Sequence, residues 1–145
     1  TKKVILMSRN ATREGQTPLH IVSFFSKNIR SLPWRPDCFA EKLTVWPGIF
    51  TPSEALTALK AGATGLKLFP GDMAQPRGLK AMRAILPAGT QVYAVGGAQP
   101  DNFADWIAAS ADGFGLGSAI YKPGDTPQSV KQKARAIVAA FDAAW

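Results

Sequence analysis

The sequence predicts an α/β fold in which short parallel strands alternate with helices. Apolar runs begin at Leu43, Leu66, Val92 and Phe114, so their starts lie about 22 to 26 residues apart. Amphipathic segments fill the intervals between the runs. This regular spacing indicates four successive βα units, and βα units pair their strands in parallel.

The four apolar runs have the composition of buried strands. They are Leu43–Ile49, Leu66–Phe69, Val92–Val95 and Phe114–Leu116. Strands of a parallel sheet are covered on both faces and read as continuous apolar stretches. A charged side chain inside such a run therefore needs a specific explanation, and Lys67 is one.

The helix after the first run has both a start signal and a stop signal. Residues 51–54 read as a capping box, in which the Thr51 side chain caps the first turn and Glu54 reaches back to the cap amide. Pro52 suits the first helical position. Gly62 is a plausible end, because glycine readily adopts the backbone conformation that closes a helix.

Amphipathic stripes predict three more helices, the last two beginning at Pro100 and after Thr126-Pro127. We interpret these stripes as packing against the sheet and assign them no function. Their members are Leu79, Met82, Ile85 and Leu86 in the first helix, Phe103, Trp106 and Ile107 in the second, and Val130, Ala134, Ile137, Val138 and Phe141 in the third.

Residues 1–42 do not continue this rhythm. Val4–Met7 and Ile21–Phe25 are candidate strands without a clear amphipathic helix between them, and Ser31–Asp37 reads as a loop. Four interpretations stay open: a divergent or disordered extension, a stretch that departs from the original coding frame, imperfect substitute strands, or a basic arm. We divide the chain into this unmatched basic segment and the βα region of residues 43–145.

Composition places the chain among globular proteins without a membrane span. It has 145 residues, of which 46% are hydrophobic, and no apolar run is long enough to cross a bilayer. The single cysteine, Cys38, and the single histidine, His20, exclude an internal disulfide and the common zinc sites. We expect a cytoplasmic protein that uses no metal and no cofactor.

The net charge of +7 raises the question of nucleic acid as a partner. Most of the excess comes from residues 1–42, which hold eight lysines and arginines against three acidic residues. That segment has no recognisable motif for reading nucleic acid. We expect neither nucleic acid nor a membrane as a partner.

Lys67 is the candidate catalytic residue. Strand alternation directs Leu66 and Leu68 to one face of their strand and Lys67 and Phe69 to the other. Burial favours the neutral amine, and a neutral amine can attack a ketone to form an imine. The alternative is a lysine that reaches solvent along its aliphatic stem or pairs with a carboxylate.

Glycines at the ends of the next two runs predict an anion site. Gly96 and Gly97 follow one run, and Gly117 and Ser118 follow the other. Glycine lets backbone N–H groups approach an anion closely, and Ser118 adds a hydroxyl near an expected helix start. The last two strands of an α/β barrel often bind phosphate at this end. Each pair alone also fits a tight turn with no ligand.

These motifs, in this order, resemble the class I aldolases that act on 2-keto-3-deoxy-6-phospho sugar acids. Val45–Ala55 resembles their fifth strand and the helix after it, Gly65–Pro70 the sixth strand, Tyr93–Gly97 the seventh and Gly115–Ser118 the eighth. The resemblance implies a TIM (β/α)8 barrel, of which the chain from about Leu43 onward forms the C-terminal four units.

The resemblance also implies a site and a reaction. Lys67 corresponds to the Schiff-base lysine and Phe69 to a pocket position beside it. The substrate phosphate site corresponds to Gly96, Gly97, Gly117 and Ser118. The implied reaction cleaves 2-dehydro-3-deoxy-6-phosphogalactonate to pyruvate and glyceraldehyde 3-phosphate. Related enzymes are trimers, so we expect a homo-oligomer.

Two features bear on how far this resemblance extends. Val95–Ala98 and Gly117–Tyr121 resemble the phosphogalactonate branch more than the phosphogluconate branch. The first four strands of the family supply an arginine, a proton-shuttling glutamate and a threonine- or proline-bearing segment, and none of these matches residues 1–42. The open alternatives are an aldolase of either branch, a catalytically incomplete phosphate-binding half barrel, and another phosphate-binding barrel enzyme in which Lys67 only contacts substrate.

Overall fold

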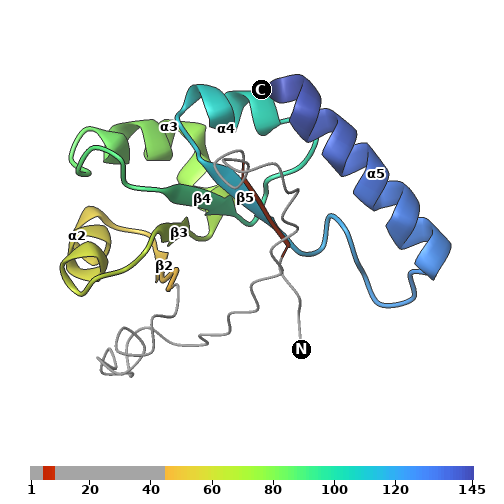
Figure 1. The fold of residues 1–145 in the computed structure, drawn as a ribbon, viewed down its shortest axis with the longest axis horizontal. Helices are drawn as coiled ribbons and strands as arrows, with labels where there is room; N and C mark the ends of the chain where they lie inside the picture. The colour runs from red at the N-terminus through yellow and green to blue at the C-terminus, as the bar shows by residue number, and fades with distance from the viewer. Residues whose placement is uncertain (1–4, 9–44) are drawn as a thin grey trace, which may run out of the picture.

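The computed structural model describes residues 5–8 and 45–145, which form a five-stranded sheet with helices packed on it (Figure 1). The strand order is β1-β5-β4-β3-β2. Four of these strands run parallel to one another. They are β2 (Gly48–Ile49), β3 (Leu66–Leu68), β4 (Val92–Val95) and β5 (Gly113–Leu116). The predicted α/β class with four parallel strands is confirmed.

A helix follows each parallel strand. The helices are α2 (Pro52–Lys60), α3 (Gly71–Arg83), α4 (Phe103–Ala108) and α5 (Pro127–Ala144). The predicted capping box is present, because the Thr51 hydroxyl accepts a hydrogen bond from the Glu54 N–H and the Glu54 carboxylate accepts one from the Thr51 N–H. α2 ends two residues before Gly62, whose φ of 91° turns the chain toward β3.

α3 consists of two helical segments joined at Gln75. This residue has a φ of 58° and a ψ of 163°, which are not helical values. Pro76 follows it, and a proline fits the first turn of the second segment because an N–H there needs no helical partner. The first segment keeps Gly71 at the end of β3, close to the β4 turn.

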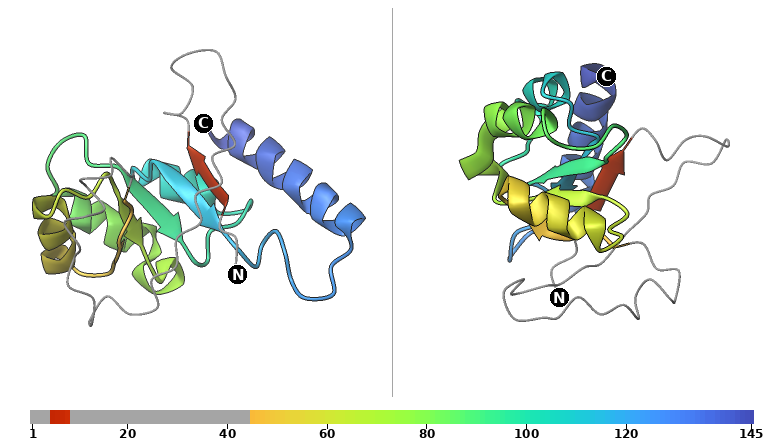
Figure 2. Two further views of the ribbon diagram at one scale, coloured as in Figure 1. Left: turned by 60° about the horizontal axis from the view of Figure 1, so that its bottom comes forward. Right: turned by 90° about the vertical axis from the view of Figure 1, so that its left-hand side faces the viewer.

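All four helices pack on one face of the sheet (Figures 1 and 2). The buried core on this face joins alternate residues of the strands to residues from every helix. The strand members are Ile49, Leu66, Leu68, Val92, Ala94, Phe114 and Leu116, and the helix members include Ala55, Ala58, Leu79, Met82, Phe103, Trp106, Ile137 and Phe141.

Two residues of the predicted stripes do not join this core. Ile85 is 46% exposed because α3 ends at Arg83, so helical spacing no longer sets its direction. Val138 is 43% exposed because it follows Ile137 by one residue, which turns its side chain about 100° around the helix. The other members of the stripes pack against the sheet as predicted or remain partly buried.

The strand predicted near Val4–Met7 is present as β1 (Ile5–Ser8). It runs antiparallel along β5, unlike the four βα strands. The other expectations for residues 1–42, including the strand at Ile21–Phe25 and the loop at Ser31–Asp37, lie outside the described residues.

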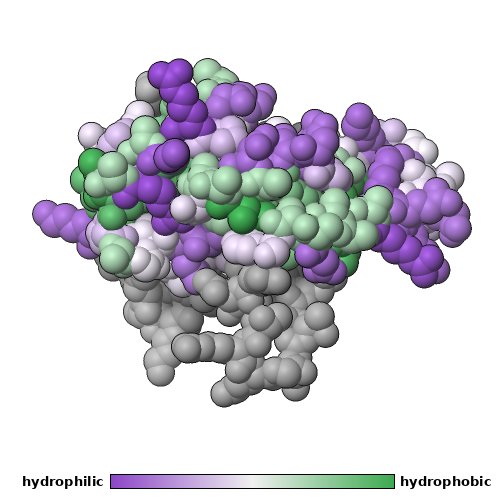
Figure 3. Space-filling model, turned by 90° about the horizontal axis from the view of Figure 1, so that it is seen from above, coloured by the Kyte–Doolittle hydropathy of each residue, from purple (hydrophilic) through white to green (hydrophobic). Residues whose placement is uncertain are grey.

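Hydrophilic side chains spread across the outer surface of α3, α4 and α5, with smaller hydrophobic areas between them (Figure 3). Among the described residues, no helix is long and apolar enough to cross a membrane.

Candidate active site

Lys67 lies on the face of the sheet opposite the helices. Its neighbours across the parallel ladder are Gly48 of β2 and Tyr93 of β4. Leu66 and Leu68 are fully buried in the helix-covered core, whereas Lys67 is half-buried. The predicted alternation of this strand is therefore confirmed.

Desolvation by burial lowers the pKa of Lys67 from its ordinary value of 10.5. Burial disfavours the charged ammonium, so a larger fraction of the amine is neutral at a given pH. In the part of the chain that the structure describes, Lys67 pairs with no carboxylate. The neutral fraction of the amine carries the lone pair that a nucleophile needs.

Phe69 is at the mouth above this lysine. The Lys67 Nζ lies 5.5 Å from the centroid of the Phe69 ring, within the range of a cation–π contact. The same ring also meets Gly96, since a Cβ built on that glycine would lie 3.3 Å from it. Lys67, Phe69 and the turn after β4 are thus one contiguous group, and Phe69 remains 50% exposed.

The Gly96-Gly97 turn lies directly against the start of α3. Gly96 has a φ of 84° and Gly97 a φ of 79°, which favour glycine. A Cβ on Gly97 would lie 2.8 Å from the Asp72 Cβ, and one on Gly71 would lie 2.4 Å from the Gly96 carbonyl oxygen. Two backbone segments therefore approach each other at the C-terminal ends of β3 and β4.

Hydrogen bonding leaves donors available in this turn. The Asn102 side chain donates a bond of 2.8 Å to the Gly97 carbonyl, which fixes the orientation of the turn. The N–H groups of Gly96 and Gly97 donate to no other described residue. Free amides in a glycine turn are the groups that anion sites in proteins use.

Gly117 and Ser118 follow β5, the strand next to β4. Both are exposed, and a Cβ on Gly117 would meet nothing within 4 Å. The expectation of a helix start at Ser118 is wrong. Residues 118–120 form a turn closed by bonds from the Ile120 and Tyr121 N–H groups to the Gly117 carbonyl, and α5 starts only at Pro127.

Sequence reasoning did not assign a role to Trp46 and Tyr93. Their rings are perpendicular, with centroids 4.4 Å apart, on the Lys67 side of the sheet. A Cβ on Gly65 would lie 2.2 Å from the Trp46 ring, so this ring covers Gly65. The signal in the sequence was the alternation that places Trp46, Gly48, Gly65 and Lys67 on one face, but contact across strands depends on their register.

The remaining strand positions on this face supply no acid or base of the carboxylate type. They are Gly48 of β2, Val95 of β4, and Gly113 and Gly115 of β5. Nor do the described residues contain a cluster of three or more histidine, cysteine or acidic residues that could hold a metal ion.

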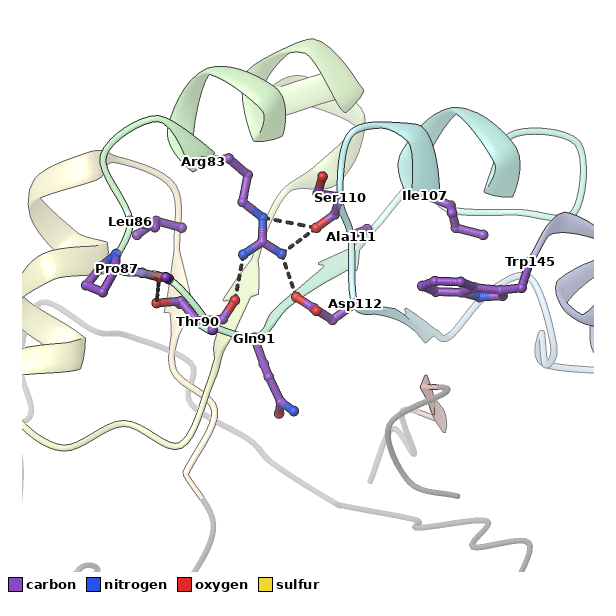
Figure 4. A pocket seen from close by; sticks show the side chains of 12 residues that line it. Arg83, Leu86, Pro87, Thr90, Gln91, Ile107, Ser110, Ala111, Asp112 and Trp145 are labelled. Carbon is purple, nitrogen blue, oxygen red and sulfur yellow. Dashed lines mark hydrogen bonds and ion pairs between the residues drawn. The ribbon is translucent and has the colours of Figure 1, made fainter. Parts of the chain in front are cut away.

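A separate pocket of about 560 Å³ lies at the opposite end of the strands (Figure 4). Arg83 crosses it and donates hydrogen bonds to the carbonyls of Thr90 and Ser110 and to the Asp112 carboxylate. The same carboxylate accepts a bond of 2.7 Å from the Val92 N–H. Because these bonds join α3 to the starts of β4 and β5, we assign Arg83 a structural role.

Four parallel strands with helices on one face, and a lysine and glycine turns at their C-terminal ends, define part of an α/β barrel of the TIM type. A family model described as KDPG and KHG aldolase matches residues 33–133. The chain belongs to this aldolase family.

Individual relatives agree with the family match. The probable 2-dehydro-3-deoxy-6-phosphogalactonate aldolase of Rhizobium meliloti (strain 1021) is 48% identical over 71% of this chain and 49% of its own length. The 2-dehydro-3-deoxy-6-phosphogalactonate aldolase of Escherichia coli (strain K12) is 46% identical over 68% of this chain and 48% of its own.

A solved structure described as native KDPGal has a TM-score of 0.73 and 43% identity. The match covers 75% of this chain and 53% of that one. The chain therefore spans about half the length of the relatives it matches.

Proposed function

We propose that this chain supplies the Schiff-base lysine of an aldolase that cleaves 2-dehydro-3-deoxy-6-phosphogalactonate to pyruvate and glyceraldehyde 3-phosphate. The observation that carries the proposal is the position of Lys67, half-buried beside Phe69 and free of a described carboxylate partner. Two relatives named for this substrate, 46% and 48% identical, support the galactonate branch over the gluconate branch.

In the proposed reaction, the neutral Lys67 amine attacks the C2 carbonyl of the substrate. Loss of water gives a protonated imine, which accepts the electron pair of the breaking C3–C4 bond. The C4 hydroxyl loses its proton as it becomes the aldehyde of glyceraldehyde 3-phosphate. The resulting enamine takes a proton at C3, and water then hydrolyses the imine to release pyruvate and restore the amine.

The substrate phosphate is assigned to the turns after β4 and β5. Support comes from the unused N–H groups of Gly96 and Gly97 and from the exposed Gly117 and Ser118 on the neighbouring strand end. Backbone amides bind phosphate without carrying a charge that would compete for the carboxylate of the substrate. Phe69 forms the wall between this site and Lys67.

Borohydride trapping tests the proposal. Native protein is incubated with pyruvate and sodium borohydride, digested and mapped by mass spectrometry, with borohydride alone as the blank. We expect a reduced pyruvate adduct on Lys67 and not on the exposed Lys80, and Lys67→Met should abolish it. Folded native protein with an unmodified Lys67 would falsify the covalent mechanism.

A second candidate function is phosphate binding by a catalytically incomplete half barrel. It is favoured by one observation: the described strands offer no carboxylate on the Lys67 face to take the C4 hydroxyl proton. A positioned acid or base contributes about 10²- to 10⁴-fold to rate. Pyruvate release from the phosphorylated substrate, coupled to lactate dehydrogenase, separates the candidates, because the half barrel forms the adduct without turnover.

A further inference from the structure

Trp46 occupies an unusual place for a large aromatic side chain. It lies two residues before Gly48, which pairs with Lys67 across the ladder, and the backbone around it bonds to the segment before β3, from the Thr64 N–H to the Val45 carbonyl and from the Lys67 N–H to the Pro47 carbonyl. The Trp46 ring covers Gly65, where any side chain would clash with it. Its far edge reaches Tyr93 on β4, so the indole spans β3 just before Lys67.

The Trp46 ring places an apolar surface beside Lys67, on the side toward the N-terminal end of β3. Gly65 and Lys67 are two residues apart and point to the same face, and Tyr93 is the register partner of Lys67. The lysine head is directed the other way, toward Phe69 at the mouth. The aliphatic stem therefore rises from an aromatic floor formed by Trp46 and Tyr93.

Among the described residues, no charged side chain accounts for the lowered pKa of Lys67. On β2, β3, β4 and β5 the residues that share its face are Gly48, Tyr93, Val95, Gly113 and Gly115, none of which is acidic or basic. At the mouth, Glu54 accepts bonds from the Phe50 and Thr51 amides and Asp72 from the Met73 amide. Burial alone accounts for the lowered pKa of the Lys67 amine.

We propose that Trp46 is a positioning residue that shields the Lys67 amine from water on its N-terminal side and so keeps it ready to attack a keto acid. The proposal rests on the Schiff-base function for its biological meaning. The floor itself is a physical feature of the chain, and its effect on the amine is measurable without any substrate.

Competitive acylation measures that effect. Native protein and variants are labelled with a trace of acetic anhydride over a pH series, and the Lys67 peptide is quantified against the exposed Lys80 peptide. In native protein the labelling midpoint of Lys67 should lie below 10.5. Trp46→Ala admits water and should raise the labelling midpoint of Lys67. For each pH unit by which the midpoint rises, the neutral amine available at a pH below it falls about tenfold. Trp46→Phe keeps a ring over Gly65 and should restore the native midpoint.

Two controls isolate the floor. Trp145→Ala removes an exposed tryptophan from the far pocket and should leave the Lys67 midpoint in place. Circular dichroism and thermal unfolding establish that each variant is folded. If Trp46→Ala does not fold, Trp46→Leu replaces it, and a smaller upward move is expected.

The outcomes separate this proposal from the proposed function. A folded Trp46→Ala or Trp46→Leu with the native midpoint overturns the floor, even if pyruvate is trapped on Lys67. A native midpoint that rises on Trp46→Ala supports the floor, and failure to trap pyruvate in the same native sample then counts only against the aldolase mechanism.

Discussion

Lys67 links burial to the pH dependence of folding. Its pKa is lowered in the folded chain, so between that value and its unfolded value near 10.5 the unfolded state binds more protons. Stability therefore rises with pH across this window, and the full desolvation cost is present below it. Lys67→Met removes this cost. We expect the variant to be the more stable protein at pH 7, by a margin that shrinks toward pH 10.5.

Urea unfolding of native protein and Lys67→Met at several pH values measures this margin. Lys80→Met, on the exposed side of α3, controls for the loss of one positive charge. A margin between native protein and Lys67→Met that does not change with pH contradicts the lowered pKa.

Alanine substitutions at Gly97 and Gly89 distinguish the cost of a positive φ from the cost of a steric clash. Both have a positive φ, 79° and 80°, but a Cβ on Gly97 would meet Asp72 whereas one on Gly89 would meet nothing within 4 Å. A left-handed backbone costs an ordinary residue about 1–2 kcal/mol. We expect Gly89→Ala to lose about that much free energy of unfolding and Gly97→Ala clearly more. Chemical denaturation measures both losses. Equal losses of unfolding free energy would show that the start of α3 moves away from the new Cβ at no cost.

Side-chain directions that depend on alternation within one strand were predictable. Lys67 and Phe69 lie together on one face, as the sequence indicated, and Leu66 and Leu68 on the other. The contact of Trp46 with Gly65 and Tyr93 was not predictable. It joins three strands, and their relative register is set by hydrogen bonds between segments distant in sequence.

The capping box of α2 is an element-scale feature with a matched pair of variants. Glu54 accepts hydrogen bonds from the Thr51 and Phe50 N–H groups, at 2.9 Å and 2.8 Å. Glu54→Ala removes the carboxylate oxygen that accepts both bonds at the exposed helix start and should cost about 1 kcal/mol. Glu54→Gln retains an acceptor oxygen and should recover most of the loss. Thermal unfolding checks both, and an unaltered midpoint for Glu54→Ala would refute the role.

Helix starts were predicted correctly where a capping side chain bonds to the first turn, and wrongly where the following residues form a different turn. The starts of α2 and α5 follow from Thr51 and Thr126, whose side chains accept bonds from amides three residues ahead. Ser118 carries a hydroxyl of the same kind, but Gly117 closes a turn around it and no helix follows. The stripe from Leu79 onward did not reveal the first segment of α3 or the break at Gln75, because both lie before its first apolar residue.

The whole sheet shows which long-range features escape the sequence. Repeated βα spacing predicted four parallel strands, and the structure places them in the order β5-β4-β3-β2. β1 lies more than a hundred residues before β5 in the chain and pairs with it antiparallel. No local pattern in Ile5–Ser8 specifies that partner or that direction.

The arrangement of this sheet predicts self-association. All described helices cover one face, and β2, only two residues long, is an outer strand with no described partner on its far side. Unpaired edges favour association with another chain.

We expect light scattering to detect a homo-oligomer at micromolar concentration, and the thermal midpoint to rise with protein concentration, because association stabilises only the folded chain. A monomeric mass with a midpoint independent of concentration would contradict assembly through this sheet. Pyruvate trapping on Lys67 in such a monomer would in turn show that the imine needs no second chain.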